Sequence, residues 1–370
     1  MILKPVNLEE LLHRERIEVD SGSAKRLLSG RTVMITGAAG SIGSELTRQI
    51  AHYQPSYLVL VDQAETPLHD LRLMMRNDFP EINAILTLAN ITDAVAMERI
   101  FKVNPPDYIF HAAAYKHVPM MEENPYESVK NNVEGTRVMA DLAVRYGALK
   151  FVMVSTDKAV NPTNVMGCSK RICEIYVQSL DKAIENGQIN GRTQFVTTRF
   201  GNVLGSSGSV IPLFEKQIRE GGPITVTHPD IKRYFMLIPE ACSLVIEAGT
   251  KGHGGEIYTF DMGNPVKVAD LAQRLIELSG AENISIKFTG LREGEKLFEE
   301  ILDDNEESVE HLHPRIKVAK VREYSYEEAN EKLDLLAKIS QTGSDMDIVA
   351  YMKRIVPEYK SRNSVYERLD

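Results

Sequence analysis

The sequence predicts an α/β protein with a Rossmann-type, doubly wound parallel sheet and a smaller C-terminal substrate-binding portion. Three observations point to this fold: apolar strands alternate with helical segments over the first 200 residues, a glycine turn of spacing GxxGxxG follows the first strand, and an acidic residue ends the second strand. Alternation of this kind is typical of parallel sheets. Farther along the chain the alternation loosens, as expected of a portion assembled around the carboxyl edge of the sheet.

Short apolar runs predict the strands, and the segments between them predict the helices. The first 28 residues are charged and mixed, with a short amphipathic piece around Leu8, Leu11 and Leu12, and we expect a tail there. The expected strands are 32–36, 57–61, 84–88, 108–110 and 151–154, and the expected helices are 44–53, 93–103 and 126–146. Later segments are expected as helices over 267–279, 324–339 and 346–355, a short strand over 285–288, and a mobile polar end over 360–370.

The glycine turn and the second strand together indicate a dinucleotide. Gly37, Gly40 and Gly43 let the backbone approach a pyrophosphate, and the N-terminus of the following helix receives its charge. Asp62 stands where an acidic residue hydrogen-bonds the adenosine ribose of NAD, and Gln63 follows instead of an arginine that would meet a 2′-phosphate. NAD is therefore favoured over NADP. The alternatives are a merely structural tight turn and a strand-end carboxylate.

Composition and spacing exclude several other classes of ligand. The net charge of −9 argues against a nucleic-acid partner, because phosphate-backbone binding usually requires a basic face. The three cysteines form no CxxC pair, and His111 and His117 have no carboxylate–histidine spacing, so we expect no metal. The sequence has no apolar run of the roughly 18 residues that a membrane-spanning helix needs.

A proton-transfer site is predicted after the strand 151–154. Thr156, Asp157 and Lys158 supply a hydroxyl, a carboxylate and an amine, and Lys170 supplies a second amine, all within fifteen residues. Small residues at 112–114 allow close backbone approach at the carboxyl edge of the same sheet, where ligands of such folds bind.

Seven strings of residues carry a family resemblance. They are GAAGSIGSEL (37–46), HAAAYKHVP (111–119), STDKA (155–159), FGNVLG (200–205), GSVIP (208–212), HPD (228–230) with RYFM (233–236), and TGLREGEKL (289–297). With them, the chain resembles an extended short-chain dehydrogenase/reductase over residues 8–303, and within that superfamily the nucleotide-sugar 4,6-dehydratases that act on UDP-N-acetylglucosamine. The resemblance implies a hydro-lyase of polysaccharide or glycan biosynthesis.

The reaction that the resemblance implies has no net redox change. Tightly bound, recycled NAD takes a hydride from C4, water is lost across C5 and C6, and the hydride returns to C6 to give a UDP-4-keto-6-deoxy sugar. Lys158 is expected to remove the C5 proton, with its pKa lowered by burial and nearby positive charge. Asp157 is expected to protonate the departing C6 hydroxyl, provided that the cleft keeps it protonated when needed. Thr156 is expected to hydrogen-bond the C4 oxygen.

The sequence departs from the superfamily pattern at Met166. Most short-chain dehydrogenases carry Tyr-x-x-x-Lys; here Lys170 is present, but a thioether that cannot accept a proton replaces the tyrosine. Lost activity, a slipped motif and transfer of the tyrosine's duty are the three interpretations. Tyr176 lies on the wrong side of Lys170 for a slip, so we favour transfer to Asp157, which would accept the C4 hydroxyl proton and later donate at C6. The variant resembles the long, membrane-anchored branch of the family, associated with retention at C5.

The same resemblance assigns binding residues. The expected cofactor residues are Gly37, Ala39, Gly40, Ser41, Ile42, Gly43, Asp62, Asn90, Ile91, Ala112, Ala113, Ala114, Asn132 and Lys170, the last on the nicotinamide ribose. The expected substrate residues are Lys116, His117, Asn202, Val210, Arg233, Arg292 and Glu295. Ser206 stands where relatives often have an arginine, and the two arginines can compensate by two-point binding of phosphate oxygens. Glu295 is expected on the uridine ribose or as a helix-start carboxylate.

Four parts of the chain are expected from these assignments: an N-terminal tail (1–28), a mainly NAD-binding Rossmann domain (29–200), a mainly UDP-sugar-binding portion (201–303) and a C-terminal helical extension (304–370). The alternative functions are a C5-inverting 4,6-dehydratase, a UDP-sugar 4-epimerase and a non-catalytic NAD-binding Rossmann protein. The family usually dimerises through helices equivalent to those from Tyr126 and Met166, so we expect a homo-oligomer. A cytoplasmic location is expected, on the inner membrane if transmembrane helices precede Leu8 in the full-length protein.

Overall fold

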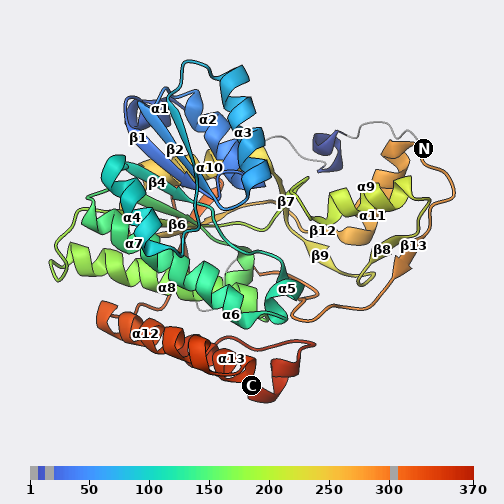
Figure 1. The fold of residues 1–370 in the computed structure, drawn as a ribbon. Helices are drawn as coiled ribbons and strands as arrows, with labels where there is room; N and C mark the ends of the chain where they lie inside the picture. The colour runs from blue at the N-terminus through green and yellow to red at the C-terminus, as the bar shows by residue number, and fades with distance from the viewer. Residues whose placement is uncertain (1–6, 13–20, 301–306) are drawn as a thin grey trace.

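The computed structural model describes residues 7–12, 21–300 and 307–370, which form a large α/β body with a smaller lobe beside it (Figure 1). The expected boundary at 303/304 lies outside the described residues, and the division into four parts stays a prediction. No helix in the described ranges is long and apolar enough to cross a membrane.

The body is built on a nine-stranded sheet. Its order is β14-β15-β11-β6-β5-β4-β1-β2-β3, parallel from β11 to β3 and antiparallel at β15 and β14. The strands are β1 (Thr32–Thr36), β2 (Tyr57–Asp62), β3 (Ala84–Leu88), β4 (Tyr108–His111), β5 (Lys150–Val154), β6 (Gln194–Arg199), β11 (Ile257–Phe260), β14 (Glu307–His313) and β15 (Ile316–Lys320). The predicted fold class and the five predicted strands are confirmed.

The register of the sheet brings the ends of its central strands to one edge. Thr36 pairs with Val61 of β2 and with His111 of β4, and His111 pairs with Met153 of β5. The glycine turn, Asp62, the small residues 112–114 and the segment after β5 therefore all leave the sheet at the same edge. This is the edge at which ligands of doubly wound sheets bind.

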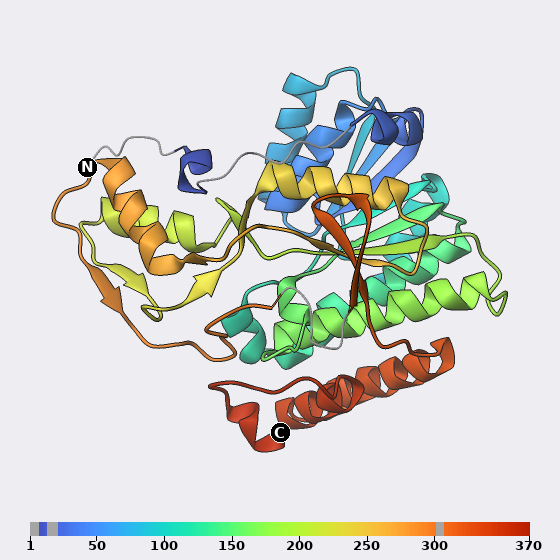
Figure 2. The same ribbon diagram turned by 180° about the vertical axis from the view of Figure 1, so that it is seen from behind.

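Two layers of helices cover the two faces of the sheet (Figures 1 and 2). One layer buries its apolar side chains in a core with residues of β1, β2 and β4, and consists of α1 (Ser21–Leu28), α2 (Ser41–Ala51), α3 (Glu65–Asp78) and α10 (Ile238–Lys251). The opposite layer consists of α4 (Ala94–Val103), α7 (Gly135–Arg145), α8 (Val165–Glu185), α12 (Tyr326–Thr342) and α13 (Asp345–Ile355). Apart from 126–146, the helices predicted in these layers are confirmed in position, with ends that differ by a few residues.

The expected helix 126–146 is not a regular α-helix. It consists of α6 (Pro125–Ser128), a π-helical segment η2 (Val129–Glu134) and α7, preceded by the short α5 (Val118–Glu122). Such π-segments are frequent at functional sites. Here the segment carries Asn131 and Asn132, both buried, toward the candidate site.

The smaller lobe has its own apolar core, formed by short elements. These are η1 (Leu8–Leu11), β7 (Asn202–Leu204), α9 (Val210–Arg219), β8 (Ile224–Val226), β9 (Lys232–Arg233), β10 (Phe235–Leu237), β12 (Val266–Lys267), α11 (Val268–Ser279) and β13 (Ile286–Phe288). Leu11 is buried in this core, and Leu28 is buried against the sheet. The described parts of the expected N-terminal tail thus pack on the folded protein.

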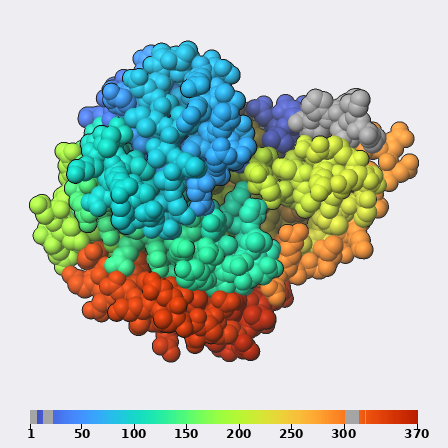
Figure 3. Space-filling model, viewed as in Figure 1, coloured from blue at the N-terminus to red at the C-terminus, as the bar shows by residue number. Residues whose placement is uncertain are grey.

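The C-terminal residues depart most from expectation. Besides the two predicted helices, the expected C-terminal helical extension contains the hairpin β14–β15, which extends the main sheet. Next, α12 packs on α8 and the π-segment, and α13 packs on α8 and α6. In Figure 3 the C-terminal residues form the red band along the bottom of the molecule. The mobile end expected over 360–370 is instead docked, because Lys360 and Arg362 donate backbone N–H groups to the carbonyls of Pro162 and Thr163. It ends in the 3₁₀ helix η4 (Val365–Leu369), where Tyr366 is buried.

The helices expected to mediate dimerisation are largely covered within this chain. From Val165 to Val177, every residue of α8 is buried. A partner that approached α8 would therefore have to displace α12 and α13 or pack onto them. The oligomeric state stays a prediction.

Candidate functional site

The glycine turn between β1 and α2 is shaped by two close backbone approaches. Gly37 has a φ of +65°, and a Cβ atom there would lie 2.7 Å from the backbone nitrogen of Ala113. A Cβ atom on Gly43 would lie 2.0 Å from the carbonyl oxygen of Gly37. Only glycine fits at either position. Helix α2 begins at Ser41, so its first-turn N–H groups face the turn, as an anionic ligand requires.

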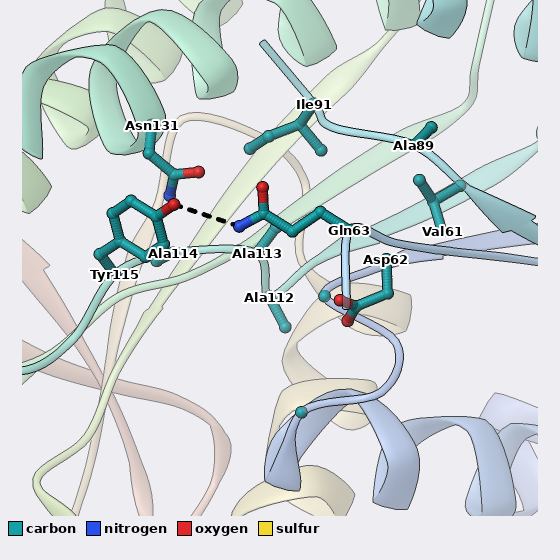
Figure 4. Close-up of a pocket in the computed structure, with 12 residues that line it drawn as sticks. Val61, Asp62, Gln63, Ala89, Ile91, Ala112, Ala113, Ala114, Tyr115 and Asn131 are labelled. Atoms are coloured by element: carbon teal, nitrogen blue, oxygen red, sulfur yellow. Dashed lines mark hydrogen bonds between the residues drawn. The ribbon is translucent and has the colours of Figure 1, made fainter. Parts of the chain in front are cut away.

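A pocket lies at the carboxyl edge of β1, β2 and β4 (Figure 4). Twelve residues line it. Seven are predicted cofactor residues, namely Gly37, Gly40, Asp62, Ile91, Ala112, Ala113 and Ala114, and five are not among those predicted, namely Val61, Gln63, Ala89, Tyr115 and Asn131. Asp62 Oδ2 accepts the backbone N–H of Ala39 at 2.9 Å, which ties the turn to the end of β2. Across the pocket, Gln63 Nε2 donates to the Tyr115 hydroxyl at 3.3 Å.

The two predicted asparagines hold the walls of this pocket. Asn90 donates to Gln63 Oε1 at 2.8 Å. Asn132 binds both backbone groups of Tyr115: its Oδ1 accepts the N–H at 2.8 Å, and its Nδ2 donates to the carbonyl at 3.0 Å. Its Nδ2 also donates to Ser169 Oγ at 3.0 Å, so the π-segment joins the loop after β4 to helix α8.

His111 is a buried structural residue. Its Nδ1 lies 2.7 Å from Thr36 Oγ1 and its Nε2 lies 3.0 Å from Thr136 Oγ1, which links β1 to α7. Burial, aided by the positive charge of Lys170, lowers the pKa of His111 to about 3, so the ring is neutral. Within the described ranges, no group of three or more histidine, cysteine, aspartate or glutamate residues could hold a metal ion.

Three of the predicted proton-transfer residues form one cluster just after β5: Asp157 and Lys158 lie on the 3₁₀ turn η3 (Asp157–Ala159), and Thr156 is its N-cap. The fourth, Lys170, lies on α8. Asp157 is buried, and its Oδ1 accepts from Thr156 Oγ1 and from Lys158 Nζ, each at 3.0 Å. Lys158 Nζ also donates to Asn202 Oδ1 of β7 at 3.2 Å. The other oxygen of Asp157, Oδ2, is buried without a hydrogen-bond partner.

The expected pKa shift of Lys158 is wrong in sign. Burial alone would lower its pKa, but the carboxylates of Asp157 and Glu299 outweigh burial and the nearby Arg233, so the pKa of Lys158 lies above its ordinary value. The sequence suggested positive charge near Lys158, but it did not show that the Glu299 carboxylate lies 3.6 Å from Lys158 Nζ. These carboxylates therefore favour the ammonium form of Lys158.

Met166 and Lys170 lie one turn apart at the start of α8. Both are buried, and burial lowers the pKa of Lys170. Gly167 lets this helix touch the proton-transfer turn, because a Cβ atom there would lie 2.1 Å from the carbonyl oxygen of Lys158. The N-cap residue Asn164 accepts the backbone N–H of Gly167 at 2.7 Å, which fixes where α8 begins.

Lys116, His117 and Val210 lie where the two lobes meet. Lys116 Nζ donates to the carbonyl of Ser207 at 3.0 Å, and burial lowers its pKa. His117 lies against Gly208, where a Cβ atom would approach its ring to 2.7 Å. Val210 is the first residue of α9. These residues therefore frame the loop between β7 and α9.

The predicted arginines lie in different environments. Arg233 is buried, and its NH2 group donates to the carbonyl of Lys296 at 2.8 Å and to Glu295 Oε1 at 3.3 Å. Glu295 Oε2 in turn accepts the backbone N–H of Arg292 at 3.0 Å, while the Arg292 residue is exposed. The structure thus joins Arg233, Glu295 and Glu299 to the Lys158 cluster and leaves Arg292 at the surface.

The family model that matches residues 33–321 is described as a polysaccharide biosynthesis protein. The chain belongs to this family. It is 46% identical to the capsular polysaccharide biosynthesis protein CapD of Staphylococcus aureus over 87% of this chain and 53% of that protein. It is also 31% identical to a UDP-N-acetylglucosamine 4,6-dehydratase (inverting) of Campylobacter jejuni, over 83% of this chain and 90% of that protein.

Solved structures agree with the observed fold. Pen from Bacillus thuringiensis matches with a TM-score of 0.75 at 30% identity, over 84% of this chain and 99% of that one. DesIV of Streptomyces venezuelae, a dTDP-glucose 4,6-dehydratase solved with NAD and DAU, matches in fold with a TM-score of 0.64 at 22% identity, over 73% and 87%. The resemblance to extended short-chain dehydrogenases and UDP-N-acetylglucosamine 4,6-dehydratases is confirmed. The chain spans about half the length of CapD, one of the curated relatives that this chain matches.

Proposed function

We propose that this chain is an NAD-dependent UDP-N-acetylglucosamine 4,6-dehydratase. It is a hydro-lyase that retains the configuration at C5 and forms a UDP-2-acetamido-2,6-dideoxy-4-keto-hexose. The observation that carries the proposal is the cluster of Thr156, Asp157 and Lys158. It puts a hydroxyl, a buried carboxylate and an amine beside the sheet edge that holds the dinucleotide-type glycine turn. A simple hydride transfer would not need an acid and a base side by side.

NAD is the cofactor that fits the pocket of Figure 4. Alanines at 112–114 leave room for close approach, the α2 N-terminus suits a pyrophosphate, and Asp62 suits a ribose. The NAD-bound structure of DesIV, which has the same fold, supports this choice. Bound there, NAD supplies the hydride acceptor for C4 and the hydride donor for C6, with Lys170 on the nicotinamide ribose.

The proton transfers are assigned to three residues. Asp157 accepts the proton of the C4 hydroxyl and later donates a proton to the departing C6 hydroxyl, while Thr156 hydrogen-bonds the C4 oxygen. Lys158 removes the C5 proton, which the C4 ketone has acidified, and returns a proton to C5 when the hydride is delivered to C6. Because the surrounding carboxylates favour its ammonium form, Lys158 has to lose a proton before it can act as this base.

The UDP-sugar is proposed to lie between the two lobes. Lys116, His117, Asn202 and Val210, near where the lobes meet, are proposed to contact it, and Arg233, Arg292 and Glu295 are proposed for the diphosphate and uridine. Arg233 would exchange some of its present carbonyl and carboxylate partners for phosphate oxygens. A guanidinium fork can do so because phosphate offers the same two-point geometry.

The proposal of retention at C5 rests on Met166. Inversion at C5 is the second candidate, because the Campylobacter jejuni relative is named an inverting dehydratase. A 4-epimerase would need the missing tyrosine and has no use for the Asp157–Lys158 pair. A non-catalytic Rossmann protein would form no product at all. We further propose a cytoplasmic site of action in polysaccharide biosynthesis, a homo-oligomer, and a membrane domain ahead of this chain in the longer protein.

One experiment separates these functions: a proton NMR time course with UDP-N-acetylglucosamine in deuterated water. The proposal predicts a 4-keto product that has lost water, carries deuterium at C5 and keeps its C5 configuration. Inverted C5 would select the other dehydratase, and a C4 epimer without loss of water would select the epimerase. An unchanged substrate would overturn the proposal.

A further inference from the structure

A second buried carboxylate lies beside the proton-transfer cluster. Glu299 Oε1 is 3.6 Å from Lys158 Nζ and 3.7 Å from Arg233 Nε, and only 3% of its side chain is exposed. Its other oxygen, Oε2, is buried without a hydrogen-bond partner, as is Oδ2 of Asp157. Two carboxylates, each with an oxygen free to accept a hydrogen bond, therefore flank one lysine.

The segment that carries Glu299 is fixed on both lobes. The backbone N–H of Lys232 donates to the carbonyl of Leu297 at 3.1 Å, and Arg233 donates to the carbonyl of Lys296 at 2.8 Å. The ammonium group of Lys296 donates to the carbonyl of Val160, just past the proton-transfer turn, at 3.0 Å. Such repeated anchoring indicates that the approach of Glu299 to Lys158 is built into the fold.

The charges that face Lys158 come from three elements. Asp157 comes from its own turn, Arg233 comes from β9, and Glu299 comes from the loop before the undescribed residues 301–306; Asn202 of β7 is neutral. With Glu299 present, the lysine has two negative neighbours and one positive neighbour. Without Glu299, Asp157 alone would oppose burial and the positive charge of Arg233, so the pKa of Lys158 would be lower.

We propose that Glu299 is a positioning residue of the dehydration site, which holds the Lys158 ammonium against Asp157 and links it to Arg233. The role deepens the proposed function, on which its catalytic meaning rests. When Lys158 takes the C5 proton it becomes an ammonium ion, and a fixed carboxylate stabilises the charge at the moment it forms. The same carboxylate makes Lys158 a stronger base that is neutral only at higher pH.

The test measures the protonation of Lys158 without using the reaction. The NAD-loaded protein is labelled with a trace of acetic anhydride across a pH series, and acetylation of Lys158 is quantified by mass spectrometry against the exposed Lys216 in the same digest. Replacing Glu299 by Gln should move the labelling midpoint of Lys158 to lower pH, by about one unit. Glu300→Gln, at the exposed neighbour of Glu299, should leave the midpoint where it is in the wild type. Equal midpoints for Glu299→Gln and the wild type would overturn the proposal.

A variant that fails to fold is recognised by its thermal unfolding and NAD content. In that case Glu299→Asp, which withdraws the carboxylate by one methylene, should shift the midpoint in the same direction by a smaller amount. An unshifted midpoint in a folded Glu299→Asp protein would equally overturn the role. Because labelling needs no substrate, a wild-type protein that makes no keto sugar would contradict only the proposed function.

A second readout connects the residue to the reaction. In Glu299→Gln, the pH profile of C5 deuterium exchange should shift to lower pH, and its limiting rate at high pH should fall, because the base is weaker. A merely structural role would lower the rate at every pH and leave the midpoint unchanged, which is the opposite result.

Discussion

Asp157 and Lys158 are adjacent in sequence and joined by a 3.0 Å hydrogen bond between Oδ1 and Nζ, while Oδ2 of the aspartate is buried and unpaired. Asp157 thus has one carboxylate oxygen that is held by Lys158 and one that can accept a further hydrogen bond. Replacing Asp157 by Asn keeps the shape but removes the exchangeable carboxyl proton. We expect dehydration to fall by about 10²–10⁴-fold, the range for a lost general acid or base, with NAD content unchanged. The 4-keto product and the released NAD report the two quantities, and a variant that dehydrates at the wild-type rate would refute the two-step role of Asp157.

Met166 should be replaceable by another apolar side chain of the same volume. A thioether carries no proton, so Met166→Leu should retain an activity near that of the wild type, whereas Met166→Tyr should overpack the buried site and cost about 1–3 kcal/mol of stability. Turnover and thermal unfolding of both variants are the measurements. A large loss of turnover in a stable Met166→Leu protein would mean that the sulfur itself takes part.

The two close-contact glycines should separate cofactor binding from chemistry. A Cβ atom on Gly43 would lie 2.0 Å from a carbonyl oxygen, and one on Gly167 would lie 2.1 Å from another. The two alanine substitutions therefore cause steric clashes of similar severity. Gly43→Ala distorts the glycine turn and should lose NAD. Gly167→Ala instead pushes α8 from the Asp157–Ala159 turn and should keep NAD while losing turnover. Equal loss of NAD in both variants would show that the turn and α8 are not separable in this way.

The stability of the fold should decline as pH falls through the range governed by His111. Its pKa is lowered from 6.5 to about 3, so between these values the unfolded chain binds a proton that the folded chain does not. The contribution is fully present above pH 6.5 and is lost as the pH falls toward 3, at up to about 1.4 kcal/mol per pH unit. Urea unfolding between pH 7 and pH 5 measures this slope. His111→Asn should flatten it, and an equal slope in that variant would assign the effect to other groups.

Removal of residues 360–370 should weaken substrate binding more than cofactor binding. The carbonyl of Arg362 accepts the backbone N–H of Gly294 at 2.7 Å, next to the proposed diphosphate residue Arg292. We expect a higher KM for the UDP-sugar with near-normal NAD content. Ser364→Ala removes the 2.8 Å bond to Glu122 and the 3.3 Å bond from the Tyr366 N–H but leaves the backbone bonds in place, so it should have a smaller effect. An unchanged KM after truncation would show that this end is not part of the substrate site.

Local patterns in the sequence predicted the parts of the fold that depend on local chemistry. Strand periodicity, the glycine turn and the adjacency of Asp157 and Lys158 all belong to short stretches, and their positions were right. The π-helical segment was missed because a π-turn adds a single residue to an otherwise helical pattern. The hairpin β14–β15 pairs with β11 through long-range hydrogen bonds that no short pattern encodes.

Glu299 was missed for a different reason. Glu299 reaches Lys158 from a distant loop, and its charge reverses the expected shift of the Lys158 pKa. A signal existed in the run LFEEI at 297–301, because a carboxylate beside apolar residues often has a buried partner. The packing of other helices on α8 also had a signal in the sequence. The first turns of α8 carry apolar residues on more than one face, and such a helix must be packed on more than one side.

The docking of residues 360–366 against Pro162, Thr163 and Glu122 has a consequence for biosynthesis of the protein. The loop that leads into α8 receives these hydrogen bonds only after the chain has been translated to about residue 366. A ribosome-bound chain that already contains the glycine turn, Asp157 and Lys170 would still lack them. Competence for the reaction should therefore appear only once residues 360–366 have emerged from the ribosome, after the cofactor pocket has formed.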